Sequence, residues 1–164
     1  MRASRAMPAP GQESVWDYPR PPRAERTGRH IEVRFNGVLV ADTRAAIRVL
    51  ETSHPPTYYL PPEDVRIDCL HEAEGRSWCE WKGAARYYDV VVGDRRARRA
   101  AWSYAAPAAP FAVIAECFAF YARLLDECLV DGERVVPQPG GFYGGWITAD
   151  VVGPFKGDPG SEGW

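Results

Sequence analysis

The sequence of 164 residues has no long apolar run and little net charge. No apolar stretch approaches the roughly 18 residues that a membrane-spanning helix needs. The first residues, MRASRAMPAPGQE, lack the apolar core of roughly 7–15 residues that a signal peptide requires. The formal charge of −2 gives no overall positive field of the kind that attracts nucleic acid or anionic membranes. We therefore expect a cytoplasmic protein that binds neither nucleic acid nor a membrane.

Lysine is nearly absent from the chain. Only Lys82 and Lys156 are lysines among the 20 basic residues, and each is followed directly by glycine. A GC-rich bacterial genome would explain the excess of arginine, but not why lysine stands at these two positions. An ammonium group is a compact donor with a tunable pKa, which a guanidinium cannot imitate. The two positions therefore merit examination, although chance explains them equally well.

Cysteine is present, but no Cys-x-x-Cys spacing is. Without a signal peptide, four cysteines are expected to be free thiols rather than a disulfide framework. Cys69, His71 and Cys79 would meet at a metal only if residues 72–78 formed a loop that brought Cys79 back. We expect no bound metal and no cofactor. The four thiols are Cys69, Cys79, Cys117 and Cys128.

Proline and glycine divide the chain into three parts. Residues 1–28 are rich in proline and arginine and have almost no apolar periodicity, so they cannot form a core alone. Within this extended arm, Trp16 and Tyr18 are apolar groups that we expect to dock on the rest of the chain. Residues 137–164 hold eight of the 15 glycines and five aromatic residues, which favours a tail packed on the domain. We expect one β-rich domain at residues 29–136, as a monomer or homodimer.

Three two-residue turns predict β-hairpins. Asn-Gly and Asp-Gly supply the positive φ angles of a type I′ turn, and Gly-Asp suits type II′. These turns predict a mainly β fold, α+β at most, in a single domain. The turns and the strands that they join are Asn36-Gly37 between residues 31–35 and 38–42, Gly93-Asp94 between 86–92 and 95–104, and Asp131-Gly132 between 128–130 and 133–136.

The segments between the hairpins carry weaker signals. Residues 43–50 suit either one or two helical turns or a strand, whereas the prolines of 53–62 require an extended backbone. After a short turn at Glu63-Asp64, residues 65–71 are predicted as a strand. Apolar residues at helical spacing over 111–125 predict one helix when taken alone.

Several short motifs follow one another between about residues 30 and 136 of this sequence. In order, they are Gly37 with Val40-Ala41-Asp42-Thr43, Pro56-Thr57-Tyr58-Tyr59-Leu60-Pro61 with Asp64-Val65, Cys79-Glu80-Trp81-Lys82-Gly83-Ala84 with Tyr87-Tyr88, Trp102-Ser103-Tyr104 with Pro107, and Phe120-Tyr121 with Val130-Asp131-Gly132. Together they resemble the family catalogued as domain of unknown function 427, which carries a nucleotidyltransferase label. Glu80 stands where that family usually has a proline after the cysteine.

The resemblance implies a compact fold of coiled antiparallel sheets with short helices, similar to the methionine sulfoxide reductase B group. It also implies a short helix at residues 109–114 and a strand at 116–121, against the single helix that the spacing predicts. We follow the resemblance at this point, because residues 117–121 suit a strand equally well. The resemblance implies no established activity.

The nucleotidyltransferase label has little support in the residues. Such chemistry needs two carboxylates that hold Mg²⁺ against the phosphates of a nucleotide. The sequence has no Asp-x-Asp pair and no Gly-x-x-x-x-Gly-Lys loop, and Asp64 and Asp68 need not converge. Whether the protein is an enzyme therefore stays open.

Cys79 is a candidate nucleophile, with Lys82 as a second candidate catalytic group. A neighbouring cation such as Lys82 favours the reactive thiolate, and His54 in the proline-rich segment is a further partner. A buried thiol without chemical function is the simpler interpretation, because free cysteine is among the most buried residue types.

Aromatic residues give the best-supported candidate site, a cavity that binds an unidentified small molecule. Trp102 and Tyr104 lie two apart on a predicted strand and so share a sheet face. An aromatic wall with a few polar groups is typical of a small-molecule site, but a closed aromatic core fits the same residues. The alternatives are an enzyme that uses Cys79 or Lys82 and an interaction module that uses the arm. The candidate ligand-binding residues are Tyr58, Tyr59, Asp64, Trp81, Tyr87, Trp102, Ser103 and Tyr104.

Overall fold

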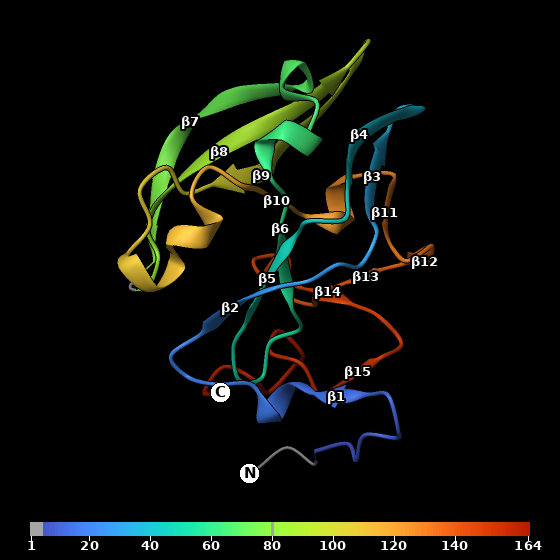
Figure 1. The fold of residues 1–164 in the computed structure, drawn as a ribbon, viewed down its shortest axis with the longest axis vertical. Coiled ribbons are helices and arrows are strands. Elements are labelled where there is room, and N and C mark those ends of the chain that lie inside the picture. Colours follow the sequence, from blue (N-terminus) through green and yellow to red (C-terminus); the bar gives the residue numbers. More distant parts are fainter. Residues whose placement is uncertain (1–4, 80) are drawn as a thin grey trace.

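The computed structural model describes residues 5–79 and 81–164. Antiparallel sheets form most of the fold (Figure 1), as the three hairpin turns predict. The first sheet contains the two longest strands and lies at the upper left of Figure 1. In pairing order its strands are β10 (Phe118–Phe120), β9 (Arg95–Ser103), β8 (Gly83–Val92) and β7 (Leu70–Cys79).

Two further sheets complete the main body. The second sheet has the order β12 (Glu133–Arg134), β11 (Glu127–Val130), β3 (Ile31–Phe35) and β4 (Val38–Thr43), and the third has the order β2 (Arg23–Arg26), β5 (Ile47–Leu50) and β6 (Thr57–Tyr59). Leu60, directly after β6, pairs with Phe118 of β10. The third sheet therefore joins the first through the extended proline-rich segment.

Among residues 5–79 and 81–164, helical structure is confined to five short 3₁₀ turns. In the part of the chain that the structure describes, no helix is long and apolar enough to span a bilayer. The five turns are η1 (Val15–Asp17), η2 (Pro62–Asp64), η3 (Ile67–Cys69), η4 (Ala109–Ile114) and η5 (Ala122–Leu124).

The predicted hairpin turns are confirmed. Asn36 and Gly37 have φ angles of 48° and 78°, and Asp131 and Gly132 have φ angles of 50° and 81°, as type I′ turns require. Gly93 has a φ of 58°, which suits the first central position of a type II′ turn. The local turn chemistry therefore sets the pairing of β3 with β4, β8 with β9 and β11 with β12.

The single helix predicted over residues 111–125 is wrong. η4 ends at Ile114, Glu116 adopts a left-handed φ of 62°, and Phe118–Phe120 pair with β9. All three residues of β10 are buried, so this strand shows no alternation of apolar and polar residues. The structure agrees with the family resemblance at this point.

One other local prediction needs correction. The strand predicted at residues 65–71 starts only at Leu70, because η3 occupies Ile67–Cys69. Residues 72–78 do not form the loop that a metal site with Cys79 would need, since they belong to β7, which pairs with β8 on both sides of an irregularity between Glu72 and Arg76. Residues 43–50, for which the sequence left helix and strand open, contain β5.

The main core lies between the first and second sheets. Val33, Val40, Val90 and Phe120 are fully buried there, and Trp146 from the C-terminal tail is buried with them. A second cluster packs against the third sheet and contains Tyr59, Trp102, Tyr104, Phe111 and Ile114. The tail thus contributes to the core of the domain.

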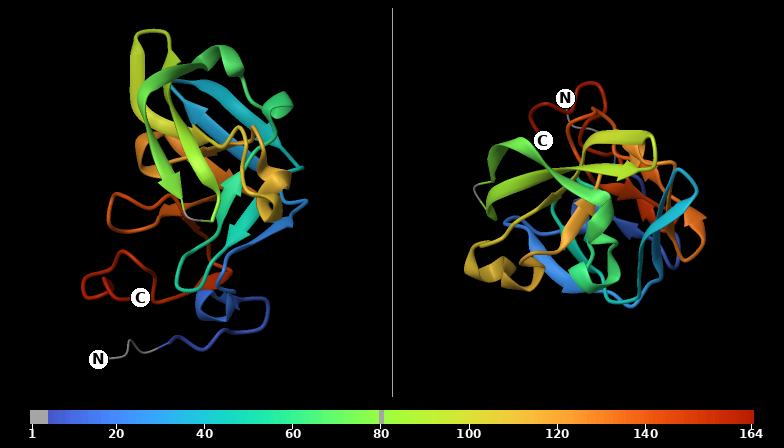
Figure 2. Two further views of the ribbon diagram at one scale, coloured as in Figure 1. Left: turned by 90° about the vertical axis from the view of Figure 1, so that its left-hand side faces the viewer. Right: turned by 90° about the horizontal axis from the view of Figure 1, so that it is seen from above.

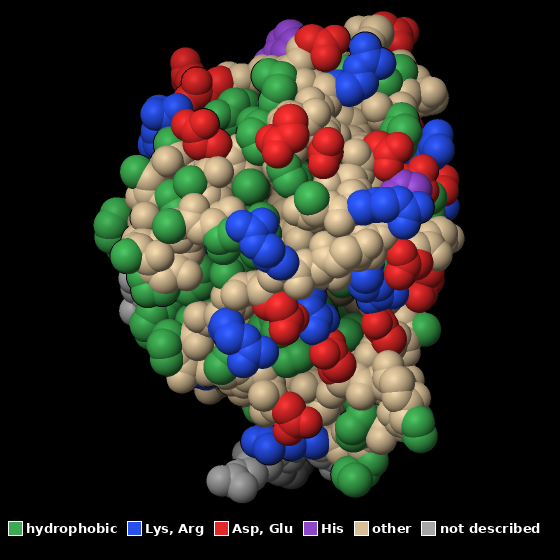
Figure 3. Space-filling model, viewed as in Figure 1, with side chains coloured by type: hydrophobic (Ala, Val, Ile, Leu, Met, Phe, Trp, Pro, Cys, Tyr) green, Lys and Arg blue, Asp and Glu red, His purple; other side chains and the backbone are tan. Residues whose placement is uncertain are grey.

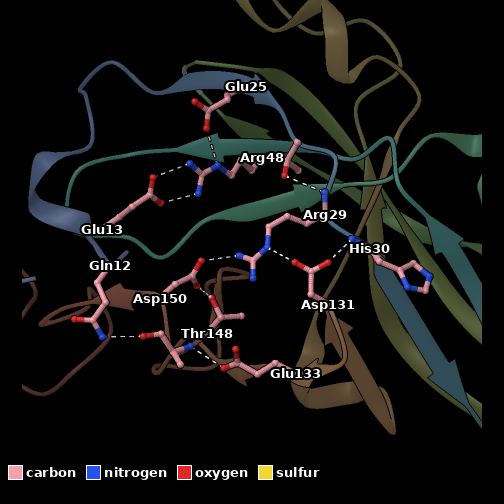
Figure 4. Close-up of polar contacts among 12 residues, drawn as sticks. Gln12, Glu13, Glu25, Arg29, His30, Arg48, Asp131, Glu133, Thr148 and Asp150 are labelled. Atoms are coloured by element: carbon pink, nitrogen blue, oxygen red, sulfur yellow. Dashed lines mark hydrogen bonds and ion pairs between the residues drawn. The ribbon is translucent and has the colours of Figure 1, made fainter. Parts of the chain in front are cut away.

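The N-terminal arm packs on its own chain. β1 (Glu13–Ser14) pairs in parallel with β15 (Val151–Val152) of the tail. Arg48 of β5 donates to both carboxylate oxygens of Glu13, at 2.7 and 2.9 Å, and to Glu25 at 2.6 Å (Figure 4). The hydrogen bonds from Arg48 hold the pKa of the Glu13 carboxyl below its usual range. The arm is therefore fixed by paired charges as well as by strand pairing.

A second arginine holds the tail. Arg29 donates to Asp131 of the β11–β12 turn at 2.9 Å and to Asp150 of the tail at 2.7 Å (Figure 4). Another short pair, β13 (Val136–Pro137) with β14 (Trp146–Ile147), closes the segment 138–145 into a loop.

Candidate functional site

A cavity of about 570 Å³ lies open to solvent where four distant parts of the chain meet. They are the end of the β7–β8 hairpin, the β5–β6 loop, the ends of β9 and β10, and the tail loop 138–145. Figure 2 (left) shows the hairpin end, the β5–β6 loop and the tail loop near one another. The site therefore depends on long-range contacts between segments.

Most of the predicted site residues line this cavity. Tyr87 of β8 and Trp102 of β9 are cross-strand partners, so the sheet places them side by side. Tyr104 lies two residues beyond Trp102 and faces the same cavity, as the alternation along a strand requires. The predicted residues at the cavity are Tyr59, Cys79, Trp81, Lys82, Tyr87, Trp102 and Tyr104.

Three predicted residues lie elsewhere. Tyr58 points to the other side of β6 and packs against Trp146, with ring centroids 5.3 Å apart. The Asp64 carboxylate accepts a hydrogen bond from the Thr43 hydroxyl at 2.7 Å. Ser103 alternates with Trp102 on β9 and lines a separate hollow of about 260 Å³. Successive side chains of a strand point to opposite faces, so Tyr58 and Ser103 point away from the cavity that Tyr59 and Trp102 line.

Sequence reasoning did not identify several residues of the wall. The tail loop contributes Gln138, Phe142, Tyr143 and Gly144. Trp78 and Phe142 both line the cavity, yet each is 76% exposed. For the tail residues the signal in the sequence is the concentration of aromatic residues among the glycines, whereas Trp78 lies on β7 and has no such signal.

Trp102 is held on several sides. Its indole Nε1–H donates to the Tyr59 hydroxyl at 3.2 Å, and its ring lies 4.6 Å from that of Tyr121. The tail loop approaches so closely that a Cβ atom on Gly144 would lie 2.1 Å from Trp102 Cη2. The absence of a side chain at Gly144 therefore permits this wall to form.

The hydroxyls of three tyrosines in the cavity wall are neutral. Burial raises the pKa of Tyr59, Tyr104 and Tyr121 above the usual tyrosine range, and the neighbouring Cys79 thiol raises that of Tyr104 further. All three hydroxyls therefore stay protonated at neutral pH and can donate hydrogen bonds, but they cannot act as bases.

His54 lines the cavity, and the contacts of its ring determine which nitrogen carries the proton. Its Nδ1 lies 2.9 Å from the Thr52 carbonyl oxygen, which can only accept, so Nδ1 carries the proton. Burial lowers the pKa of His54, so that the ring is neutral at pH 7. Nε2 is then the unprotonated nitrogen, and the ring packs edge-on against Tyr143 at 5.4 Å.

Cys79 differs from the other three thiols. It is half-buried and lines the cavity, whereas the other three are buried. Burial raises the pKa of Cys69, that of Cys117 to about 11, and that of Cys128. Cys69 and His71 lie near the opposite end of β7 from Cys79. Within residues 5–79 and 81–164, no three His, Cys, Asp or Glu side chains are close enough to hold a metal ion.

The family model described as a domain of unknown function (DUF427), and named NTP_transf_9, matches residues 23–131. The chain belongs to this family. No curated protein matches it. The DUF427 match includes the cavity walls between residues 51 and 121 but not the tail loop, which lies beyond its end.

The name of the DUF427 model implies nucleotidyl transfer, and the described residues do not fit the Mg²⁺ that such chemistry needs. Asp64 is bonded to Thr43, and the exposed Asp68 pairs with Arg66 at 3.6 Å. Glu51, the single carboxylate among the described residues of the cavity wall, lies 3.7 Å from Arg20. We therefore derive no step that uses a metal ion.

Proposed function

We propose that this DUF427 domain binds a small organic molecule in the aromatic-walled cavity. The observation that carries the proposal is the convergence of aromatic side chains from separate segments on one space with a few polar groups. A volume of about 570 Å³ is in the range of small-molecule sites. Lys82 and His54 supply the polar groups, whereas the amide of Gln138 is bonded to Gly145 and Lys156.

The rim of the cavity supports the same proposal. Trp78 from β7 and Phe142 from the tail loop remain exposed at its mouth. On the face shown in Figure 3, hydrophobic side chains gather at the left edge, over the β7–β8 hairpin that contributes to the cavity and over η4, which does not line it. Charges of both signs are interspersed over the rest of that face. Large exposed apolar groups beside a cavity are typical of a binding surface.

Four naphthalene compounds that differ only in their head group test this proposal. They are 2-naphthylmethanol, 2-naphthoate, 2-naphthyl phosphate and 2-naphthylmethylammonium. We expect saturable quenching of tryptophan fluorescence and a raised melting temperature with at least one of them. Trp78→Ala should weaken that binding about tenfold, because a stacking surface is lost.

Met7→Ala is the matched control, since Met7 is exposed and does not line the cavity. Its affinity should equal that of the original chain. Absence of saturable binding with all four compounds would refute the proposed function, as would equal affinities in the Trp78 and Met7 variants.

A second candidate function is thiol chemistry at Cys79. The observation that favours it is that Cys79 lines the same cavity as His54, whose Nε2 is free to accept a proton. At pH 7, iodoacetamide should label Cys79 and spare the three buried thiols, as mass spectrometry of tryptic peptides can show. A labelling rate above that of free cysteine supports a nucleophile. A rate at or below it means that Cys79 serves only as part of the wall.

A further inference from the structure

We propose that the ligand of this cavity is a flat aromatic anion whose carboxylate or phosphate group binds Lys82. This inference rests on the proposed function and assigns the chemical class of the ligand. It follows from the distribution of charge around the aromatic walls.

Lys82 is the cation at the cavity itself. Its Nζ lies 6.0 Å from the ring centroid of Tyr104 and 5.6 Å from that of Phe111. The backbone of this turn is held in place, since the Ala108 N–H donates to the Lys82 carbonyl at 3.2 Å. Among the described residues, Lys82 takes part in none of the ion pairs. Its ammonium group is therefore available to an anion that enters the cavity.

Two arginines add positive charge behind the aromatic wall. The Arg99 guanidinium lies over the ring of Tyr87 at 4.1 Å, and that of Arg123 lies 5.4 Å from the ring centroid of Tyr121. Arg99 donates to the Glu74 carbonyl and Arg123 to the Gly141 carbonyl, and carbonyls carry no formal charge. Within the described chain, neither guanidinium has a carboxylate within 4.0 Å. Both retain their positive charge beside the site.

Negative charge at the cavity is compensated. Glu51 is the one carboxylate among the described wall residues, and it pairs with Arg20. The buried His54 is neutral at pH 7 because burial lowers its pKa. The described residues of the site therefore carry a net positive charge, in a chain whose formal charge is −2. A local field of this sign attracts anions and weakens the binding of cations.

The aromatic walls supply flat surfaces for the rest of the ligand. Tyr59 and Trp102 are buried, whereas the wall residues Trp78 and Phe142 are each 76% exposed. The exposed rings are therefore the faces on which a planar ring can stack. Aromatic cages also bind organic cations. The three uncompensated positive groups favour an anion over that class of ligand.

The four naphthalene compounds separate these alternatives. We expect 2-naphthoate and 2-naphthyl phosphate to bind about tenfold more tightly than 2-naphthylmethanol, because they form a charge-assisted contact. The ammonium compound should bind most weakly. Lys82→Met should abolish the advantage of the anions and leave the affinity for 2-naphthylmethanol unchanged. Calorimetric titration measures all these affinities.

Arg86→Met is the matched control, because it removes one positive charge at an exposed residue that lines the other hollow. It should keep the preference for anions. Equal affinities for all four compounds, or tightest binding of the ammonium, would overturn this inference and leave the proposed function standing. If none of the four binds, both fail. The compound that binds more tightly, 2-naphthoate or 2-naphthyl phosphate, shows whether the anionic group of the natural ligand is a carboxylate or a phosphate.

Discussion

Replacing Trp146 with alanine should lower the free energy of unfolding by about 3–5 kcal/mol, the usual range for a large aromatic residue in a core. Trp146 is 1% exposed and stacks on Tyr58. Its indole Nε1–H donates to the Phe120 carbonyl at 3.0 Å, so the substitution also leaves a buried acceptor without its partner. Both effects act in the same direction.

Urea denaturation followed by circular dichroism measures this loss. Phe142→Ala provides the comparison, because Phe142 is an aromatic residue of the same tail but is 76% exposed. Its effect should stay within about 0.5 kcal/mol, as is usual for surface positions. A loss below about 1 kcal/mol in the Trp146 variant would show that the tail contributes little to the core.

The expected loss matters because Trp146 lies beyond residue 131, where the DUF427 match ends. Folded domains are stable by only about 5–15 kcal/mol, so this one side chain accounts for a large share of the total. Trp146 also links the tail to the proline-rich segment, since its backbone N–H donates to the carbonyl of Pro56, directly before β6. In this chain the family region and the tail form one core.

The sequence predicts the parts of the fold that local chemistry determines. Asn36-Gly37 and Asp131-Gly132 fix their hairpins because few residues accept two consecutive positive φ angles. Residues 118–120 could not be assigned in this way. All three are buried on both faces of β10, so their pattern fits a helix as well as a strand.

The sequence predicts which residues share one face of a strand, but not which faces of different strands meet to form the candidate site. Alternation correctly groups Trp102 with Tyr104, yet it cannot say which face of a strand meets a cavity. For that reason Ser103 and Tyr58 were included with their neighbours. The approach of the tail loop to Trp102 joins residues more than 40 positions apart, and no local pattern encodes such a contact.

Gly144→Ala should weaken binding of the preferred naphthalene compound about thirtyfold, which corresponds to about 2 kcal/mol. Gly144 does not have a positive φ, so alanine suits its backbone and the effect comes from space alone. The added Cβ would lie 2.1 Å from Trp102 Cη2. Trp102 cannot retreat, because Tyr59 and Tyr121 hold its ring from other sides. The tail loop must therefore move and open the wall that Phe142 and Gly144 complete.

Gly163→Ala makes the same substitution in the same tail, at a position where an added Cβ has no neighbour within 4 Å. Its affinity and melting temperature should match those of the original chain. The Gly144 variant should also lose about 1–3 kcal/mol of stability, as is typical of an overpacked site. Full affinity in the Gly144 variant, despite that loss, would show that the ligand does not contact the tail loop. Selectivity would then reside wholly within the DUF427 region, in the walls between residues 51 and 121.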